Sequence, residues 1–240
     1  MWYYWDTHSH NRAPPIQHRI FLWDTVSCNK VEFNQPRFAQ DASDDVRRTA
    51  FDSIYSSLGD FDFELWTDVS SSLAELASGS AALLYYSTTT NDLPVEIHRA
   101  AAGRLARSYR AECLATEKGI ISSHTFCLET SQSPTRILVA TDSLSRTEAL
   151  RVVPLAMQDY VTEEIWIMLL SLIKRGHSVN FMFSPSHCGI PRNEAADDEA
   201  MIARSLPQEG SPIWHVDFLA AARRPYWRDA QKKRKGAYTA

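Results

Sequence analysis

Residues 136–143 read RILVATDS, and this stretch indicates the fold class. Residues 137–140 are a continuous apolar run bounded by polar residues, which is typical of a strand buried on both faces. A strand of this kind needs helices to cover it, and the strongly apolar segment 162–174, TEEIWIMLLSLIK, predicts one. The pattern therefore predicts an α/β domain.

Further strands and helices are predicted on both sides of this stretch. Three strands in succession before a long helix indicate an antiparallel edge of the sheet, and later helical crossovers indicate parallel pairing. The expected fold is thus a mixed five-stranded sheet flanked by helices. Asn193 is expected to cap the last helix. The other expected strands are 63–67, 81–86, 95–99 and 179–183, and the other expected helices are 46–58, 103–119 and 193–205.

The chain divides into a domain and two flanks. The predicted domain spans residues 60–206. Before it, residues 1–59 are predicted to be an irregular connecting segment with one short helix, because Pro and polar residues interrupt it. After it, residues 207–240 form a basic extension in which 223–235 carry seven basic residues and one acid. Tyr226 and Trp227 lie among them, a mixture typical of contacts with nucleic acid but also of ordinary charged chain ends.

Composition limits the function classes. The 240 residues carry 25 basic and 29 acidic side chains, a net charge of −4, which excludes a globally basic nucleic-acid binder but not a local basic patch. Four scattered cysteines form no C-x-x-C pair, so we expect a reducing, intracellular location in the nucleus or cytoplasm. No run approaches the roughly 18 apolar residues of a membrane span, so no membrane partner is expected.

Four acidic residues stand where solubility alone explains them poorly. Asp68 and Asp142 each directly follow an apolar strand, so their carboxylates become neighbours if those strands pair about 4.8 Å apart. Mutual repulsion would raise their pKa values unless a cation lies between them. Glu112 lies within a predicted helix beside Cys113, and Asp197 lies in the first turn of the last helix. Each acid alone is also explained by a turn, a cap or a solvated helix face.

The four acids together suit a metal centre. Ligand sets made only of oxygen prefer hard cations such as Mg²⁺ or Mn²⁺ over zinc. Two such ions about 4 Å apart activate a water molecule and stabilise the leaving oxygen during phosphodiester cleavage. The pattern therefore favours a metal-dependent phosphodiester hydrolase.

Four segments also carry a resemblance to a known family. Residues 186–197, SHCGIPRNEAAD, resemble the H-x-G-I-P-G-N-E-x-A-D signature of retroelement ribonuclease H domains. Residues 66–70, WTDVS, resemble the T-D-G-S strand end of that family, and 141–143 match its T-D-S. Residues 108–112, SYRAE, are similar to the helix that bears its glutamate. The resemblance covers roughly residues 60–206, in the order of the family.

The resemblance implies a ribonuclease H-like fold and cleavage of the RNA strand of RNA–DNA hybrids, with two Mg²⁺ ions that Mn²⁺ can replace. It implies that Asp68 bridges both ions, that Glu112 and Asp142 complete one site, and that Asp197 helps to hold the other. His187 would lie on a mobile loop and assist product departure or proton transfer. The resemblance also implies a non-LTR retrotransposon context, with a reverse transcriptase in the same or a parent polyprotein.

Substrate contacts follow from the same resemblance. A hybrid is distinguished from DNA by its 2′-hydroxyl groups, and the small hydroxyl residues Ser108 and Ser143 stand beside expected site acids. Arginines at 104, 107 and 110 have helical spacing and are candidates for phosphate contacts. For these serines and arginines a merely solvated position is an equal alternative. The expected substrate-contact set is Ser108, Ser143, Arg110 and Asn193.

Departures from the family pattern support a second hypothesis. Val69 stands where the family has Gly after the first Asp, and Arg192 stands where it has Gly before Asn193. Val69 would resist a positive φ, and Arg192 would occupy a turn that Gly relaxes. The glycine-rich second strand is reduced to 77–80, ASGS. The alternative is a catalytically impaired domain of the same fold that binds nucleic acid or a protein partner.

Other chemistries fit less well. A proofreading exonuclease of this fold would need a second acid at position 70, which is Ser, and an integrase would lack the N-E-x-A-D helix. His8 and His10 have metal-ligand spacing but no third ligand nearby in sequence.

Overall fold

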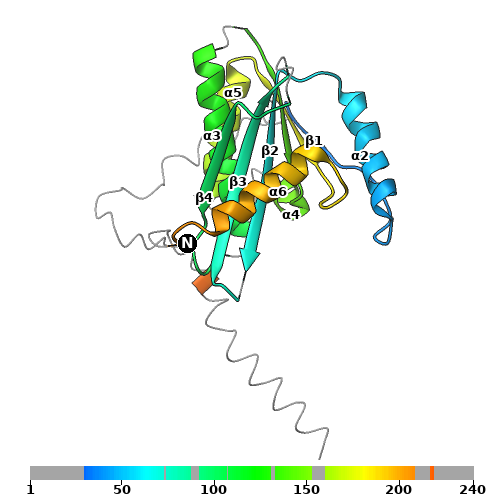
Figure 1. Ribbon diagram of the computed structural model, residues 1–240. Coiled ribbons are helices and arrows are strands. Elements are labelled where there is room, and N and C mark those ends of the chain that lie inside the picture. Colours follow the sequence, from blue (N-terminus) through cyan, green and yellow to red (C-terminus); the bar gives the residue numbers. More distant parts are fainter. Residues whose placement is uncertain are drawn as a thin grey trace, which may run out of the picture.

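The computed structural model describes residues 30–72, 74–87, 92–106, 108–130, 133–152, 160–208 and 217–218. These residues form a six-stranded sheet with helices on both faces (Figure 1). The strands are β1 (Val31–Asn34), β2 (Phe63–Ser72), β3 (Ala77–Tyr86), β4 (Glu96–Ala101), β5 (Arg136–Thr141) and β6 (Ser178–Phe183). The helices are α2 (Asp44–Leu58), α3 (Ser108–Thr130), α4 (Leu144–Arg151), α5 (Tyr160–Lys174) and α6 (Pro191–Arg204). None of these helices has the length and apolar content that crossing a bilayer requires.

The sheet is mixed, as the sequence predicts. The spatial order of strands is β1-β6-β5-β2-β3-β4. Strands β2, β3 and β4 pair antiparallel, whereas β2, β5, β6 and β1 pair parallel. The prediction of five strands is wrong by one, because β1 arises in a segment predicted to be irregular apart from one helix. Its four residues become a strand by pairing with β6, a partner far along the chain that no local pattern reveals.

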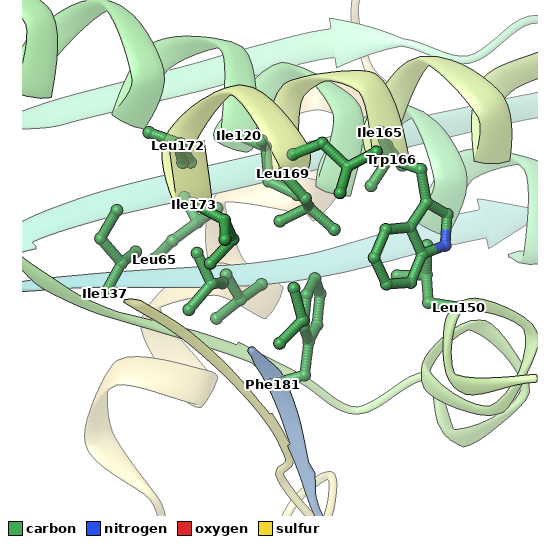
Figure 2. Packing of buried hydrophobic residues seen from close by; sticks show 14 of the residues in the cluster. Leu65, Ile120, Ile137, Leu150, Ile165, Trp166, Leu169, Leu172, Ile173 and Phe181 are labelled. Atoms are coloured by element: carbon green, nitrogen blue, oxygen red, sulfur yellow. The ribbon is translucent and has the colours of Figure 1, made fainter. Parts of the chain in front are cut away.

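Two hydrophobic cores explain the apolar run in β5. Ile137 and Val139 face a core that α5 and α3 cover, shown in Figure 2, in which Leu65, Ile120, Ile165 and Phe181 also lie. Residues 138 and 140 face the other core, which includes buried residues of α6. Alternate side chains of one strand therefore fill both cores, and the strand is apolar at every position.

Helix α6 crosses the sheet in close contact with β3 (Figure 1). A Cβ atom at Gly79 would lie 2.5 Å from the carbonyl carbon of Ala203 and 2.6 Å from the oxygen of Ala200. No side chain fits in that space. Gly79, the glycine retained in segment 77–80, therefore allows the backbone of α6 to pack directly against β3.

The flanks of the predicted domain pack against it. Phe51 of α2 is only 3% exposed and its ring lies 5.9 Å from that of Trp66 in β2. On the other side, the Gln208 side-chain oxygen accepts hydrogen bonds from the backbone N–H groups of Ser78 and Gly103, at 3.2 and 3.1 Å. The boundaries at residues 60 and 206 remain predictions, but the described flanking residues share the cores and hydrogen bonds of the domain.

Candidate metal centre

Two acids lie side by side where β5 ends. Thr67 of β2 pairs with Thr141, the last residue of β5, and each is followed directly by an aspartate. The prediction that Asp68 and Asp142 are neighbours is therefore confirmed. The strand that carries Asp68 is longer than predicted, because β2 continues to Ser72 in its pairing with β3. Asp68 thus lies within a strand, and its position is fixed on one side by the ladder.

A third acid joins them from α3. Asp68, Glu112 and Asp142 each offer a carboxylate oxygen within 4.8 Å of the other two, and we call these three residues the acidic trio. Glu112 is buried between Ala111 and Cys113, so the alternative of a solvated helix position does not apply to it. Of the four acids that the sequence predicts to form one metal centre, these three lie together in the structure.

The trio has the chemistry of a site for a hard divalent cation. Glu112 Oε2 and Asp142 Oδ1 are buried and have no hydrogen-bond partner among the described residues. Buried acceptors are rarely left in this state unless a water molecule or an ion completes them. An oxygen-only set suits Mg²⁺ or Mn²⁺. The residues therefore fit the metal that the sequence predicts.

Burial and mutual repulsion favour the protonated forms of the trio. The pKa of Asp68 is raised to about 8, first by burial and then by the charge of Asp142, against the lowering effect of the Val69 N–H that donates to it at 2.6 Å. The pKa of Asp142 is raised to about 6, by burial and then by Asp197. The pKa of Glu112 is raised well above its usual value, by burial first and then by both aspartates. A bound cation would reverse this preference.

The metal-free protein is expected to lose stability as the pH rises from 7 to 8. An acid whose pKa is raised on folding stabilises the folded state at low pH, and that contribution is lost as pH rises through the folded pKa, which for Asp68 is about 8. The slope approaches about 1.4 kcal/mol per pH unit for each proton held only by the folded state. Buried His177, whose pKa is lowered by burial, acts with the opposite sign, but only below its ordinary value of 6.5.

Urea unfolding in EDTA at several pH values between 5 and 8.5 measures this loss. Added Mg²⁺ should flatten the dependence, because the cation favours the ionised carboxylates. A free energy of unfolding in EDTA that stays constant or increases from pH 7 to 8 would contradict the expectation.

Asp197 and His187 border the trio. Asp197 lies in the second turn of α6, not the first as predicted, because that helix begins earlier, at Pro191. It is not part of the set within 4.8 Å, but its negative charge raises the pKa of both Asp68 and Asp142. His187 Nδ1 lies 3.9 Å from Asp197 Oδ2, and the imidazole is 73% exposed. The structure thus joins three of the four acids closely and sets the fourth beside them with an accessible histidine.

The start of α6 differs from the prediction. Ile190, not Asn193, is the N-cap, because Pro191 occupies the first helical position, where its missing N–H costs nothing. Asn193 lies inside the first turn, is 2% exposed, and its Oδ1 has no hydrogen-bond partner among the described residues. Its assignment as a substrate contact stays a prediction.

The predicted substrate contacts differ in their exposure and in their contacts. Ser108 is exposed at the first residue of α3, one turn before Glu112. Ser143 is buried and caps α4, where its Oγ accepts a hydrogen bond from the Arg146 N–H at 3.3 Å. The expectation for Arg110 is corrected, because its side chain is 2% exposed and Nη1 lies 3.3 Å from Asp217 Oδ2. The guanidinium of Arg110 is therefore engaged in an ion pair inside the fold.

One predicted basic position lies outside its expected helix, and the other basic and histidine positions lie outside the described residues. Helix α3 begins at Ser108 and not at residue 103, so Arg104 precedes it and no continuous arginine face forms. Position 107, the pair at 8 and 10, and the basic stretch 223–235 lie outside the described residues.

The two departures from the family pattern are accommodated without the expected strain. Val69 lies in the regular ladder of β2, paired with Ser80, and has no positive φ. Arg192 lies in a helix, not in a turn. Its Nη1 is 2.7 Å from Glu64 Oε2, its Nη2 is 2.7 Å from Asp92 Oδ1, and its guanidinium lies over the ring of Tyr85. The sequence patterns do not predict this network, whose one local signal is the acid Glu64 inside the apolar segment 63–67.

Comparison with known proteins yields only distant similarity. Neither a protein-family model nor a curated protein sequence matches this chain. Among solved structures, it is similar to LC11-RNase H1 in complex with an RNA/DNA hybrid, with 14% identity and a TM-score of 0.44 over 59% of this chain and 96% of that chain. It is also similar to the N-terminal RNase H domain of Rv2228c from Mycobacterium tuberculosis, fused to maltose-binding protein, with 19% identity and a TM-score of 0.43 over 59% and 98% of the two chains. A proposal for the function must therefore rest on the residues of this chain.

Proposed function

We propose that this protein is a divalent-metal-dependent endoribonuclease that cleaves the RNA strand of RNA–DNA hybrids. The observation that carries the proposal is the acidic trio, with two buried oxygen atoms that have no partner in the described structure. The proposal also uses the resemblance of segments 66–70, 108–112, 141–143 and 186–197 to retroelement ribonuclease H domains.

The residues divide the chemical work by position. Asp68, Glu112 and Asp142 would hold Mg²⁺, which supplies positive charge against the phosphate and lowers the pKa of a bound water molecule. Asp68 and Glu112 are buried and Asp142 is half-buried, which limits the rotational freedom of these side chains before substrate binds. At the open side, His187 is accessible and stands 3.9 Å from the carboxylate of Asp197. We infer that this accessible imidazole would assist product departure or proton transfer, the role that the resemblance implies.

Substrate selection belongs to the same proposal. A ribose 2′-hydroxyl is the group that separates the RNA strand from DNA, and exposed Ser108 at the start of α3 can hydrogen-bond to it. A retrotransposon context, a reverse transcriptase in the same or a parent polyprotein, and a nuclear or cytoplasmic location are further parts of the proposal.

The alternative is a non-catalytic domain of the same fold that binds nucleic acid or a protein partner. This alternative was suggested by Val69 and Arg192, because both stand where the resembled family has glycine. Val69 adopts an ordinary strand conformation, and Arg192 adopts an ordinary helical one with two ion pairs. Neither residue therefore favours impairment, and retained catalysis is the better-supported function.

Cleavage of a hybrid tests the proposal directly. With Mg²⁺, the full chain should shorten a labelled RNA strand paired with DNA and leave the same sequence intact as an RNA duplex or a DNA duplex. EDTA should stop cleavage and Mn²⁺ should restore it. Asp142→Asn should remove activity, whereas Asp198→Asn, an exposed aspartate of α6, should not. An intact hybrid in both Mg²⁺ and Mn²⁺, with measurable hybrid binding, would favour the non-catalytic alternative.

A further inference from the structure

His187 has a backbone conformation that is unusual for a residue with a side chain. Its φ is +54°, in the left-handed region that favours glycine. Such a conformation persists only when the surrounding structure determines it. The exposed imidazole lies 3.9 Å from Asp197, a contact too weak to determine the backbone by itself. The contacts of the adjacent residues therefore decide how His187 is held.

The three residues after His187 lie against helix α2 of the N-terminal flank. Each has a partner at position 44, 48 or 51 of that helix. These are Cys188 beside Asp44, Gly189 beside Arg48, and Ile190 in one hydrophobic core with Phe51. The three helix positions are spaced i, i+4 and i+7, so a single face of α2 covers residues 188–190.

Cys188 is the member of this group next to His187, and it is buried, with 6% of its surface exposed. Its thiol donates a hydrogen bond to the carbonyl oxygen of Ser186 at 3.2 Å, which closes the turn around His187. The same Sγ lies 4.0 Å from Asp44 Oδ1 in α2. Burial and then the charge of Asp44 raise the pKa of the thiol, so it keeps the proton that it donates. On the other side of the turn, the Gly189 N–H donates to Glu194 Oε1 in α6 at 3.1 Å.

We propose that Cys188 is a positioning residue that fixes the turn at His187 and so keeps the imidazole beside Asp197. This inference rests on the proposed function, in which His187 assists product departure or proton transfer. It goes beyond the resemblance, which implies a mobile loop at this position. It also gives α2 a role in the site, because that helix lies against the thiol although it precedes the predicted domain.

Backbone ¹⁵N relaxation of the metal-free full chain, without nucleic acid, tests the inference independently of catalysis. In the wild type, the amide of His187 should have an order parameter of about 0.85, the value of rigid backbone. In Cys188→Ala, which lacks the S–H group, this order parameter should fall below about 0.6. Cys188→Ser is the matched control, because its hydroxyl can still donate to the carbonyl oxygen of Ser186, and residue 187 should stay rigid.

Cleavage kinetics with Mg²⁺ test whether the position of the imidazole matters for the reaction. Cys188→Ala should lower kcat about tenfold with KM unchanged, a part of the roughly hundredfold or more that a positioned proton donor contributes. Cys188→Ser should retain most of the activity. In a His187→Ala background, Cys188→Ala should cause no further loss, because the thiol acts through the imidazole.

Each outcome separates positioning from a merely structural role. A mobile residue 187 in the wild type, or an equally rigid one in Cys188→Ala, would overturn the inference. So would a Cys188→Ser variant that behaves like Cys188→Ala, or an equal loss of kcat with and without His187. If circular dichroism shows that Cys188→Ala does not fold, Cys188→Val, which fills the space but has no donor, provides the same comparison. A wild-type protein that leaves the hybrid intact while the relaxation results hold would contradict only the proposed enzymatic function.

Discussion

Asp68→Asn is expected to abolish hybrid cleavage and, in the same protein sample, to stabilise the metal-free fold at pH 8. The two effects have one cause. The carboxylate is held among two others in a buried site, an arrangement that is unfavourable without a cation and that chelates one when it is present. Asparagine keeps the shape and retains an oxygen for the Val69 N–H, but removes the charge.

The expected sizes are large. Cleavage should fall by about a thousandfold or more, the order found when a catalytic group is removed. The free energy of unfolding in EDTA at pH 8 should rise by about 2 kcal/mol or more, because the pKa of Asp68 is raised to about 8 in the folded state. At pH 5 the folded wild type keeps Asp68 protonated whereas the unfolded chain does not, so the stability difference should be smaller than at pH 8 without disappearing. Urea unfolding at the two pH values and single-turnover cleavage measure these quantities.

The matched control is Asp198→Asn, which removes the same charge from an exposed position on α6. It should change neither cleavage nor the pH dependence of unfolding. If Asp68→Asn cleaved at the wild-type rate, or if it were less stable than the wild type in EDTA at pH 8, the trio would not be a strained metal centre. A residue with a merely structural role would lose stability and activity together, so the opposite signs identify a functional one.

The acidic trio could be predicted from sequence because each member has a local marker. Asp68 and Asp142 each follow an apolar run, and Glu112 lies beside Cys113 in a predicted helix. The parallel pairing of β2 with β5 aligns Thr67 with Thr141, the residues directly before the two aspartates. Strand and helix types follow from hydrophobic periodicity in the same way, as in β5 and α5. The predicted start of α3 is wrong. The helix begins five residues later than predicted, and Arg104 therefore lies outside it.

The remaining features depend on distant partners. Strand β1 exists because β6 is beside it, and Arg110 is buried because Asp217, far along the chain, meets it. Arg146 looks like any helical arginine in the sequence, and only the fold shows that it is fully buried with its Nη1 bonded to Thr162 of α5. Local patterns carry no information on such pairs, so sequence reasoning places the ligands of the site but not the charges that surround them.

Arg192→Gly, which installs the residue of the resembled family motif, is expected to destabilise this protein by about 3–5 kcal/mol, the usual cost of removing one partner of a buried ion pair. Glu64, only 6% exposed at its side chain, would lose the guanidinium at 2.7 Å. The Tyr55 hydroxyl and the Trp66 indole N–H also donate to Glu64, at 2.5 and 3.0 Å, and they cannot neutralise its charge. Thermal and urea unfolding measure the loss.

Arg48→Gly provides the control for the backbone effect of glycine in a helix. Arg48 lies in α2, is half exposed, and makes only a 3.9 Å ion pair with Asp52. Its replacement should cost about 1 kcal/mol, most of it from helix propensity. Adding Glu64→Gln to Arg192→Gly should recover part of the larger loss, since no unpaired buried charge then remains. Equal losses in the two glycine variants would contradict the argument. A larger loss in Arg192→Gly would mean that the ion pair between Arg192 and Glu64 stabilises the fold. The arginine at this position would then be a stabilising feature of this chain and not a sign of catalytic impairment.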